Sequence, residues 1–237
     1  MLSPTVINFS GADGAKAIRG VMLSDTAELD TNTTQVSLKA DRLIGAGTCE
    51  ADAVFLEGPH NGGAVVCDCE ITESSRRFVK TQMKNVTIRN NKGRNSGETG
   101  LDMFAFVGAQ ASGIRIIDND FSTEGAYGCQ VAVDLIDAAV VSRGNKYKSS
   151  VSVGSSSAIS RSGRIDGAEF IDDEFVNFER LVNQTSATSE VSQSIKIVAK
   201  YMRSGAAQNA VTLSGDYSDG FFDVFAPDSI TTNYFVS

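Results

Sequence analysis

A recurring interval of 26 to 28 residues constrains the fold of this chain more than any other feature. Four aromatic residues follow one another at steps of 26, 28 and 26 residues: Phe121, Tyr147, Phe175 and Tyr201. Each closes a short segment in which apolar residues precede a polar turn, as in Ile116-Ile-Asp-Asn-Asp-Phe121. A nearly constant interval of this length is typical of a solenoid, in which each repeat packs on its neighbours.

The polar turns carry a second set of residues at similar steps of 29, 26 and 28. The set is Asn90, Asn119, Asn145 and Asp173. Asn suits a bend because it tolerates the left-handed backbone conformation and its amide can bond to nearby backbone. We therefore expect these side chains to stack from repeat to repeat and to hydrogen-bond along the axis, as in other stacked strands.

The content of each repeat favours one kind of solenoid. Short β-type runs such as Val86-Thr-Ile88 and Val131-Ala-Val133 dominate, separated by Gly, Asn, Asp and Ser. Helical periodicity is weak and limited to Asp25–Asp30 and Asp173–Val182. This content excludes helical arrays, and a propeller blade needs about 40 residues. The sequence therefore predicts an all-β parallel β-helix, with a β-sandwich or jelly roll as the alternative.

The turn pattern, I-x-(N/D)-(N/D)-x-(F/Y), resembles that of the pectin-lyase-like superfamily of right-handed, single-stranded parallel β-helices. The resemblance covers roughly residues 80–217, and Val6-Ile-Asn-Phe-Ser-Gly-Ala-Asp-Gly14 is similar to the entry segment of β-helix glycosidases and phage tailspikes. It implies one of two occupations, polysaccharide cleavage or a structural part of a phage particle. For the phage branch it also implies a homotrimer.

One domain in three parts is expected. Residues 1–80 would form the entry segment and the first coils, 81–220 the regular coils, and 221–237 an aromatic cap or docking segment. That last segment holds 5 of the 18 aromatic residues in 17 positions. An open β-helix end needs a cover, and a large apolar patch also suits an interface. The candidate interface residues are Phe221, Phe222, Phe225, Tyr234 and Phe235.

Charge and hydropathy restrict the partners. The formal net charge is −8, which disfavours binding to a phosphate backbone. The sequence contains no apolar run long enough for a membrane span. The first residues carry neither a basic nor an apolar signal region, so we expect synthesis in a host cytoplasm rather than export.

Three acidic residues are the candidates for catalysis if the chain is an enzyme: Asp118, Asp172 and Asp173. Inverting glycoside hydrolysis uses two carboxyls about 6.5–9.5 Å apart. Asp118 and Asp172 occupy equivalent places two repeats apart, or about 9–10 Å along a β-helix axis. The simpler interpretation is that these acids are solvated bends. The hydrolase and lyase signatures of the superfamily are missing, which disfavours an enzyme.

The cysteines and the single histidine offer one alternative site. Cys49, His60, Cys67 and Cys69 contain the residue types of a zinc site, but one residue between Cys67 and Cys69 is not the usual ligand spacing. On a single strand, Val65, Cys67, Cys69 and Ile71 would face inward. We therefore favour cysteines buried in the core, and expect no metal and no cofactor.

These observations lead to one functional hypothesis and one alternative. The hypothesis is a structural virion protein of a phage, a short trimeric β-helix serving as a capsid decoration or a small tailspike or fibre component. Other virion proteins would be its partners, with a surface glycan as a possible ligand. The alternative is a β-helix that cleaves or binds polysaccharide with carboxylates on neighbouring coils.

Overall fold

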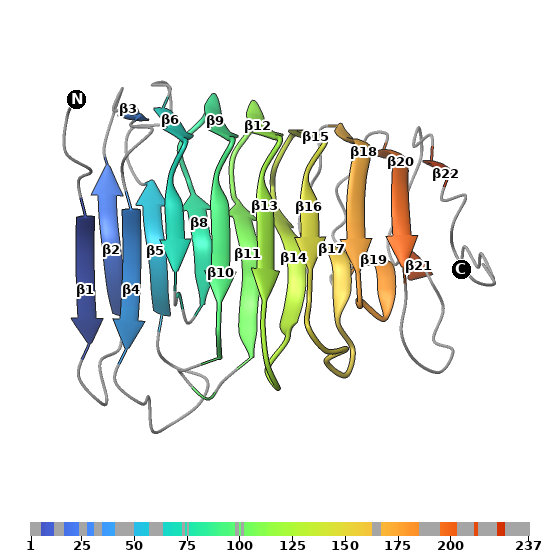
Figure 1. Ribbon diagram of the computed structural model, residues 1–237. Helices are drawn as coiled ribbons and strands as arrows, with labels where there is room; N and C mark the ends of the chain where they lie inside the picture. Colours follow the sequence, from blue (N-terminus) through green and yellow to red (C-terminus); the bar gives the residue numbers. More distant parts are fainter. Residues whose placement is uncertain are drawn as a thin grey trace.

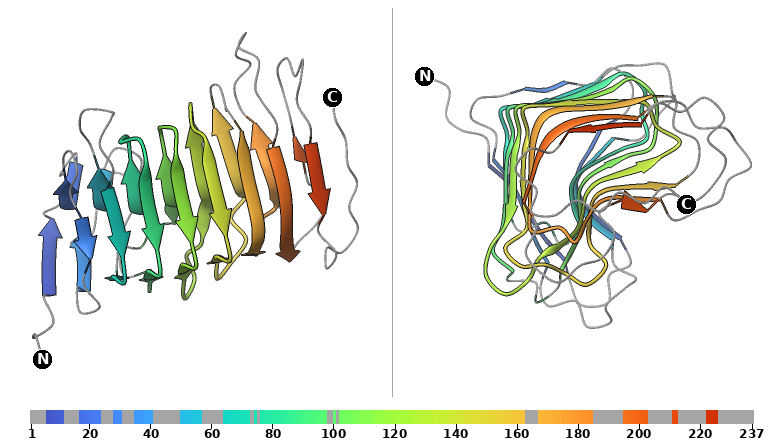
Figure 2. Two further views of the ribbon diagram at one scale, coloured as in Figure 1. Left: turned by 90° about the horizontal axis from the view of Figure 1, so that it is seen from above. Right: turned by 90° about the vertical axis from the view of Figure 1, so that its right-hand side faces the viewer.

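The computed structural model is a parallel β-solenoid (Figure 1). It describes the backbone of residues 6–11, 17–23, 28–30, 35–40, 50–56, 64–72, 74, 76–97, 100, 102–162, 167–184, 195–202, 211–212 and 222–225. Every strand pair in these residues is parallel, and each strand pairs with strands of neighbouring coils. The predicted all-β parallel β-helix is confirmed. Viewed end-on, the central coils superimpose on nearly the same outline (Figure 2).

Each regular coil contributes three strands, which stack into three files along the axis. The short file contains β3 (Glu28–Asp30), β6 (Ala64–Cys67), β9 (Val86–Arg89), β12 (Ile114–Ile117) and β15 (Val140–Arg143). The front file contains β1 (Val6–Gly11), β4 (Gln35–Ala40), β7 (Glu70–Thr72), β10 (Lys92–Asn95), β13 (Asp120–Thr123) and β16 (Lys146–Lys148). The back file contains β2 (Ala17–Leu23), β5 (Glu50–Leu56), β8 (Arg77–Thr81), β11 (Met103–Ala109), β14 (Cys129–Ile136), β17 (Ser157–Ser162), β19 (Arg180–Gln184) and β21 (Val211–Thr212).

The short and front files merge near the C-terminal end. β18 (Ala168–Val176) is one continuous strand that pairs with both β15 and β16. β20 (Ile195–Met202) stacks on β18, and β22 (Phe222–Phe225) stacks on β20. The start of the predicted C-terminal cap is thus another strand of the solenoid. The rest of that segment lies outside the described residues.

The described strands among the first 80 residues belong to the same solenoid as the later ones. β1 pairs with β4 and β2 with β5, in the same parallel register as the later coils. The motif-based prediction placed the regular coils after residue 80, because the turn motif is weak before that point. Weak helical periodicity was noted for Asp25–Asp30 and Asp173–Val182. The helix prediction was wrong for both, because the described residues of these segments belong to β3, β18 and β19 or to the turn between β18 and β19.

The corner between the short and front files has a left-handed backbone in five successive coils of the described chain. Its residues are Asp68, Asn90, Asp118, Gly144 and Asp172, all with φ between 53° and 67°. Asp, Asn and Gly are the residues that adopt this conformation at least cost. The corner changes the in–out alternation that one straight strand would have, so Val66, Cys69 and Ile71 enter the core. The predicted burial of Cys67, Cys69 and Ile71 is confirmed, whereas the prediction that Val65 faces inward was wrong, because Val65 is half-buried.

A ladder of buried amides runs along the inner side of this corner. The Oδ1 of Asn119 accepts from the backbone N and the Nδ2 of Asn91, both at 2.9 Å. Asn145 accepts in the same way from Asn119 at 2.8 Å, and Asp173 from Asn145 at 2.8 Å. The predicted stack is confirmed for Asn119, Asn145 and Asp173. It was wrong at its first member, because Asn90 occupies the left-handed corner and Asn91 joins the ladder.

The predicted aromatic file is confirmed in full. Register pairs join Phe121 to Tyr147, Tyr147 to Phe175, and Phe175 to Tyr201, and all four are buried. The rings of Tyr147 and Phe175 are stacked with centroids 5.2 Å apart. Rings from the back file, including Phe78 and Phe106, pack against this file in the core.

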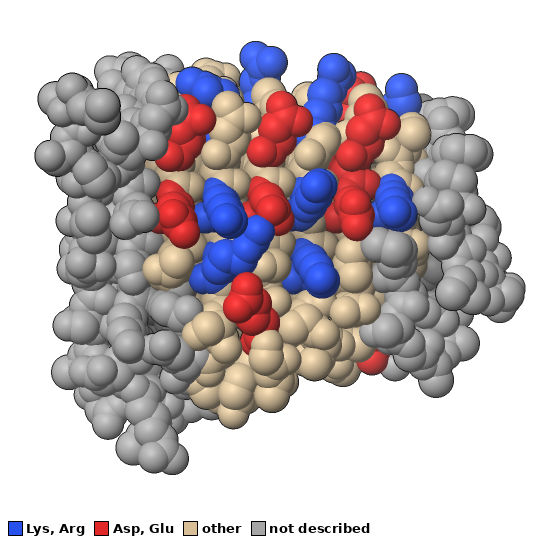
Figure 3. All heavy atoms as spheres, in the orientation of Figure 1, with Lys and Arg blue, Asp and Glu red and all other residues tan. Residues whose placement is uncertain are grey.

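A row of alternating charges lies on the outer surface of the front file, visible as alternating red and blue side chains in Figure 3. In register order it consists of Glu70, Lys92, Asp120, Lys146, Glu174 and Lys200. Opposite charges that face one another across paired strands each contribute about 0.2–1 kcal/mol, and like charges destabilise. The row therefore favours the observed register over a slipped one.

Gly93 gives a direct test of the core. It lies in the aromatic file between Ile71 and Phe121, and an added Cβ would meet the Phe78 ring at 2.5 Å and the Phe121 ring at 2.6 Å. We predict that Gly93→Ala lowers the free energy of unfolding by about 1–3 kcal/mol through overpacking. Gly154→Ala is the matched control, because nothing lies within 4 Å of a Cβ there. Equal unfolding midpoints in urea for the two variants would contradict the packing described here.

Candidate functional site

A buried group of ionisable side chains lies on the back file. Asp52 of β5 and Arg77 of β8 are register partners, and Asp134 belongs to β14, two strands further along. One guanidinium nitrogen of Arg77 lies 3.2 Å from Asp52 Oδ1, and the other lies 3.6 Å from Asp134 Oδ2. A single arginine thus connects two carboxylates on different coils.

Gly108 of β11 makes this connection possible. β11 lies between β8 and β14, and Gly108 pairs with Lys80 on one side and with Asp134 on the other. An added Cβ at Gly108 would lie 2.8 Å from Arg77 Nε and 2.9 Å from its Cδ. The side chain of Arg77 therefore passes over the glycine to reach Asp134.

The arginine is also covered by an aromatic ring. The Arg77 guanidinium carbon lies 4.6 Å from the centre of the Phe104 ring, within the range of a cation–π contact. Lys80 stands over the ring of Phe55 at 4.7 Å. These aromatic faces partly replace the water that the cations lose on burial.

Burial dominates the electrostatics of the cluster. The exposed fraction is 1% for Asp52, 3% for Arg77 and 6% for Asp134. Desolvation raises the pKa of both carboxyls above the usual range for Asp, and the opposing attraction of Arg77 is the next largest influence. Raised carboxyl pKa values also occur in active sites. Here the groups are closed to solvent, so the cluster is better suited to joining coils than to meeting a substrate.

A shallow groove of about 550 Å³ lies on the short file. Small residues line it in successive coils: Gly113, Ala139 and Gly167. Arg115 and Lys196 are the exposed cations beside it, and Glu169, which also lines it, pairs with Arg143 at 3.5 Å. At its N-terminal side the Asn85 side chain lies against Gly113. The groove therefore has a mainly apolar lining with both signs of charge at its edge.

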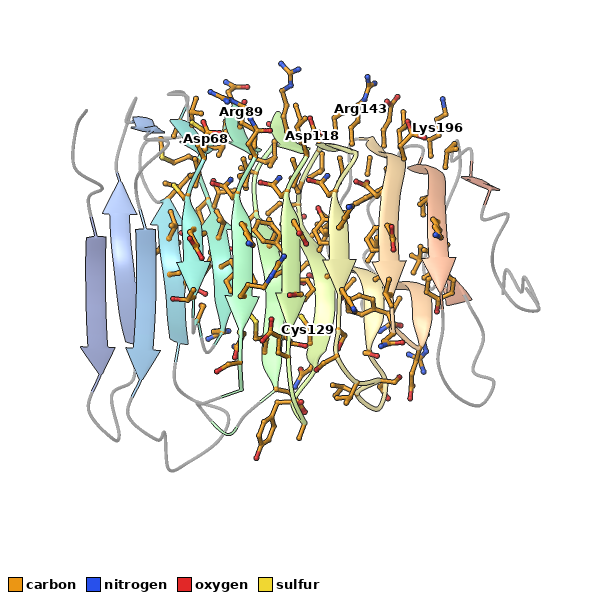
Figure 4. All side chains as sticks on the ribbon, in the orientation of Figure 1. Asp68, Arg89, Asp118, Cys129, Arg143 and Lys196 are labelled. Carbon is orange, nitrogen blue, oxygen red and sulfur yellow. The ribbon has the colours of Figure 1, made fainter. Side chains whose placement is uncertain are left out.

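The structure separates the three acids predicted for catalysis. Asp118 and Asp172 lie exposed at the left-handed corner, two coils apart, with Gly144 between them. Figure 4 shows Asp118 along the same edge of the solenoid as Asp68, Arg89 and Arg143. Asp173 is buried and faces the amide ladder, where burial raises its pKa to about 6. The three carboxyls therefore do not converge on one point, and Asp118 and Asp172 alone share a surface.

The predicted zinc set is only partly visible. Cys49 and His60 lie outside the described residues. Cys67 and Cys69 are buried, and the Cys69 thiol lies 3.1 Å from the Cys67 carbonyl oxygen, as expected for cysteines that pack as small side chains. Within the described part of the chain, no group of three or more His, Cys, Asp or Glu side chains is placed to hold a metal ion.

The candidate interface residues at the C-terminus are located only in part. Phe222 and Phe225 are the first and last residues of β22. Phe221, Tyr234 and Phe235 lie outside the described residues. Their role as an interface remains a prediction.

The Asp52–Arg77–Asp134 cluster was not predicted from the sequence. The signal that would have indicated it is a charged residue next to an apolar strand core, as in Asp52-Ala-Val-Phe-Leu56 and Arg77-Phe-Val-Lys80. These strands precede the clear turn motifs, so their phase in the repeat was not visible. Contact across Gly108 also depends on a side-chain path that no spacing rule gives.

Comparisons with known proteins identify no relative: no family model matches the chain, and neither a curated protein nor a solved structure is similar to it. Among the described residues, no helix has the length and apolar character needed to cross a membrane.

Arg77 is the residue on which the buried cluster depends. We predict that Arg77→Met lowers the free energy of unfolding by about 3–5 kcal/mol near pH 8, because two buried carboxylates lose their shared partner. The loss is expected to shrink near pH 5, where the carboxyls of the variant take up protons. The neighbouring Arg76→Met is the control and should cost about 1 kcal/mol or less. Similar small losses for both variants in urea unfolding would show that the cluster is unimportant.

Proposed function

We propose that this chain is a structural component of a phage particle, a short β-solenoid acting as a capsid decoration or as a small tailspike or fibre element. The proposal is supported by the way the side chains are used. Amides, aromatic rings and surface charges each form a file that continues from coil to coil. Such an arrangement yields a rigid rod whose long-range contacts must all be broken for unfolding.

The continuity of these files is the observation that carries the proposal. A protein made mainly of long-range strand pairing is expected to fold and unfold slowly, which gives kinetic stability outside a cell. The buried charges of Asp52, Arg77 and Asp134 add a connection between coils of the back file. A particle surface component benefits from both properties.

Assembly into a homotrimer on the particle is part of the proposal, and the C-terminal aromatic residues would contact a sister subunit or another virion protein. The fold resemblance and the aromatic composition of residues 221–237 support it. The row of alternating charges constrains the packing. Two front files facing one another, parallel and in register, would bring like charges together, so subunits would meet through other surfaces.

Electron cryo-microscopy of purified phage particles that carry this chain tests the assignment. We expect density for a rod of stacked coils at regular positions on the capsid or tail. The mass of the isolated protein in solution tests the trimer, and the expected value is three times 25.1 kDa. Absence of the chain from purified, intact and infectious particles would contradict the virion assignment.

A second candidate is cleavage or binding of a surface glycan, and one observation favours it. Asp118 and Asp172 are both exposed at the same corner and separated by two coil spacings, or about 9–10 Å. That separation is near the range used by inverting glycoside hydrolases. The pair would act as the acid and the base, with the glycan lying along the axis.

Incubation with host surface polysaccharide separates the two candidates. The structural assignment predicts that neither new reducing ends nor unsaturated uronates appear. Cleavage that is abolished by Asp118→Asn or by Asp172→Asn would establish the glycan-cleaving function. Asp137→Asn, which changes another acid with a left-handed backbone, is the matched control and should leave any cleavage unchanged.

A further inference from the structure

The amide ladder ends in a carboxyl group. Each member from Asn91 onward donates its backbone N and its Nδ2 to the Oδ1 of the next, and Asp173 receives the last pair from Asn145. The next position in register is Ala199 of β20, which has no group to continue the ladder. Asp173 is therefore both the only acid of the ladder and its terminal member.

The missing amide has a specific consequence. In every earlier coil the Nδ2 of the ladder residue also donates to a short-file carbonyl oxygen: Asn91 to Val66, Asn119 to Ile88 and Asn145 to Ile116, at 2.8–2.9 Å. Because Ile116 pairs with Ser142, the equivalent carbonyl for Asp173 is that of Ser142. An ionised carboxylate oxygen has nothing to donate to it, whereas a protonated carboxyl has.

The surroundings of Asp173 favour the protonated form. Its Oδ2 is buried and makes no hydrogen bond. Burial is the main reason that the pKa is raised to about 6, the hydrogen bonds from Asn145 and Ser142 oppose the shift, and the charge of Asp172 reinforces it. Tyr147 of β16 is a titratable group of a neighbouring strand that interacts with Asp173, and it is neutral because burial holds its pKa far above the ordinary value.

Nearby cations do not face this carboxyl. Lys146 of β16 and Lys200 of β20 flank Glu174 in the outer charge row, one residue further along β18. Arg143 of β15 is exposed and pairs with Glu169. The ladder position of Asp173 is thus surrounded by Asn145, Ser142 and Tyr147, with no positive charge among them.

We propose that Asp173 is a proton-binding switch at the end of the ladder, which fastens β18 and the coil that follows it to β15 and β16 when it is protonated. Protonated Asp173 reproduces the missing amide by donating to the Ser142 carbonyl. Ionised Asp173 leaves a buried charge at the same junction. The C-terminal coils are therefore held tightly in acid and loosely at neutral pH, while the coils before Asn145 do not respond.

The direction of the effect follows from linkage. The native state holds the Asp173 proton up to a pKa of about 6, whereas the unfolded chain releases it near 3.8. The stabilisation is complete below the lower value and is lost as the pH rises through the higher one. Between about pH 4.5 and about pH 7.5, the opening equilibrium of the junction shifts about thirtyfold toward the open state.

Amide hydrogen exchange of the whole chain, compared with Asp173→Asn, tests the switch. The asparagine donates to Ser142 at every pH, so its amides in β18 and β20 should exchange at nearly the wild-type rate near pH 4.5. Near pH 7.5 they should exchange at least about tenfold more slowly than wild type. Amides of β9 serve as an internal reference and should not differ at either pH.

Two further measurements decide the outcome. A carbon-13 titration of the Asp173 carboxyl should show a midpoint near 6, and a midpoint in the ordinary range for Asp would overturn the proposal. Asp118→Asn, which removes an exposed acid at the corner, is the matched control and should exchange like wild type throughout. Equal exchange in β18 for wild type and Asp173→Asn near pH 7.5 would equally rule the switch out.

Discussion

Hydrogen bonds that pass from one coil to the next through buried amides are the interaction on which the solenoid depends. Water is excluded beside the corner, so each polar group there must be satisfied by a neighbouring coil. Asn119 meets this demand in both directions, since it accepts from Asn91 and donates to Asn145. Its second amide hydrogen bonds to the Ile88 carbonyl oxygen and ties the ladder to the short file. Coil spacing, corner conformation and strand register are therefore coupled at one residue per coil.

The left-handed residue before each ladder position makes this coupling possible. It turns the chain so that the amide points inward and the next strand begins on the front file. Where the turn is lost, at β20, the ladder is lost too, because Val198 and Ala199 follow one another without an extra residue. In β18 the two files already form one strand, but Asp172 keeps the left-handed turn and Asp173 keeps its place in the ladder, so the ladder ends only when the turn is lost.

Spacing alone was enough to predict the fold class and the whole aromatic file, because these depend on a repeat that recurs in the sequence. Spacing predicted the start of the ladder at Asn90, whereas it lies at Asn91. Asn90 and Asn91 are adjacent and of the same residue type, so the sequence does not distinguish them. Only the backbone does, because Asn90 has a positive φ and forms the corner. The connection of Asp52 to Asp134 through Arg77 was not predicted either. It depends on a long side chain that crosses Gly108, and such a contact produces no repeating pattern in the sequence. Spacing correctly paired Asp118 with Asp172 and placed Asp173 in the amide stack, where the structure finds it buried.

The alternating charges of the front file set a rule for the length of such a rod. Deleting the one coil that contains Lys92 would place Glu70 beside Asp120, so that two acids are neighbours. Deleting that coil together with the next would place Glu70 beside Lys146 and restore the attraction. Internal duplications and deletions in this architecture are thus tolerated more easily when they involve an even number of coils.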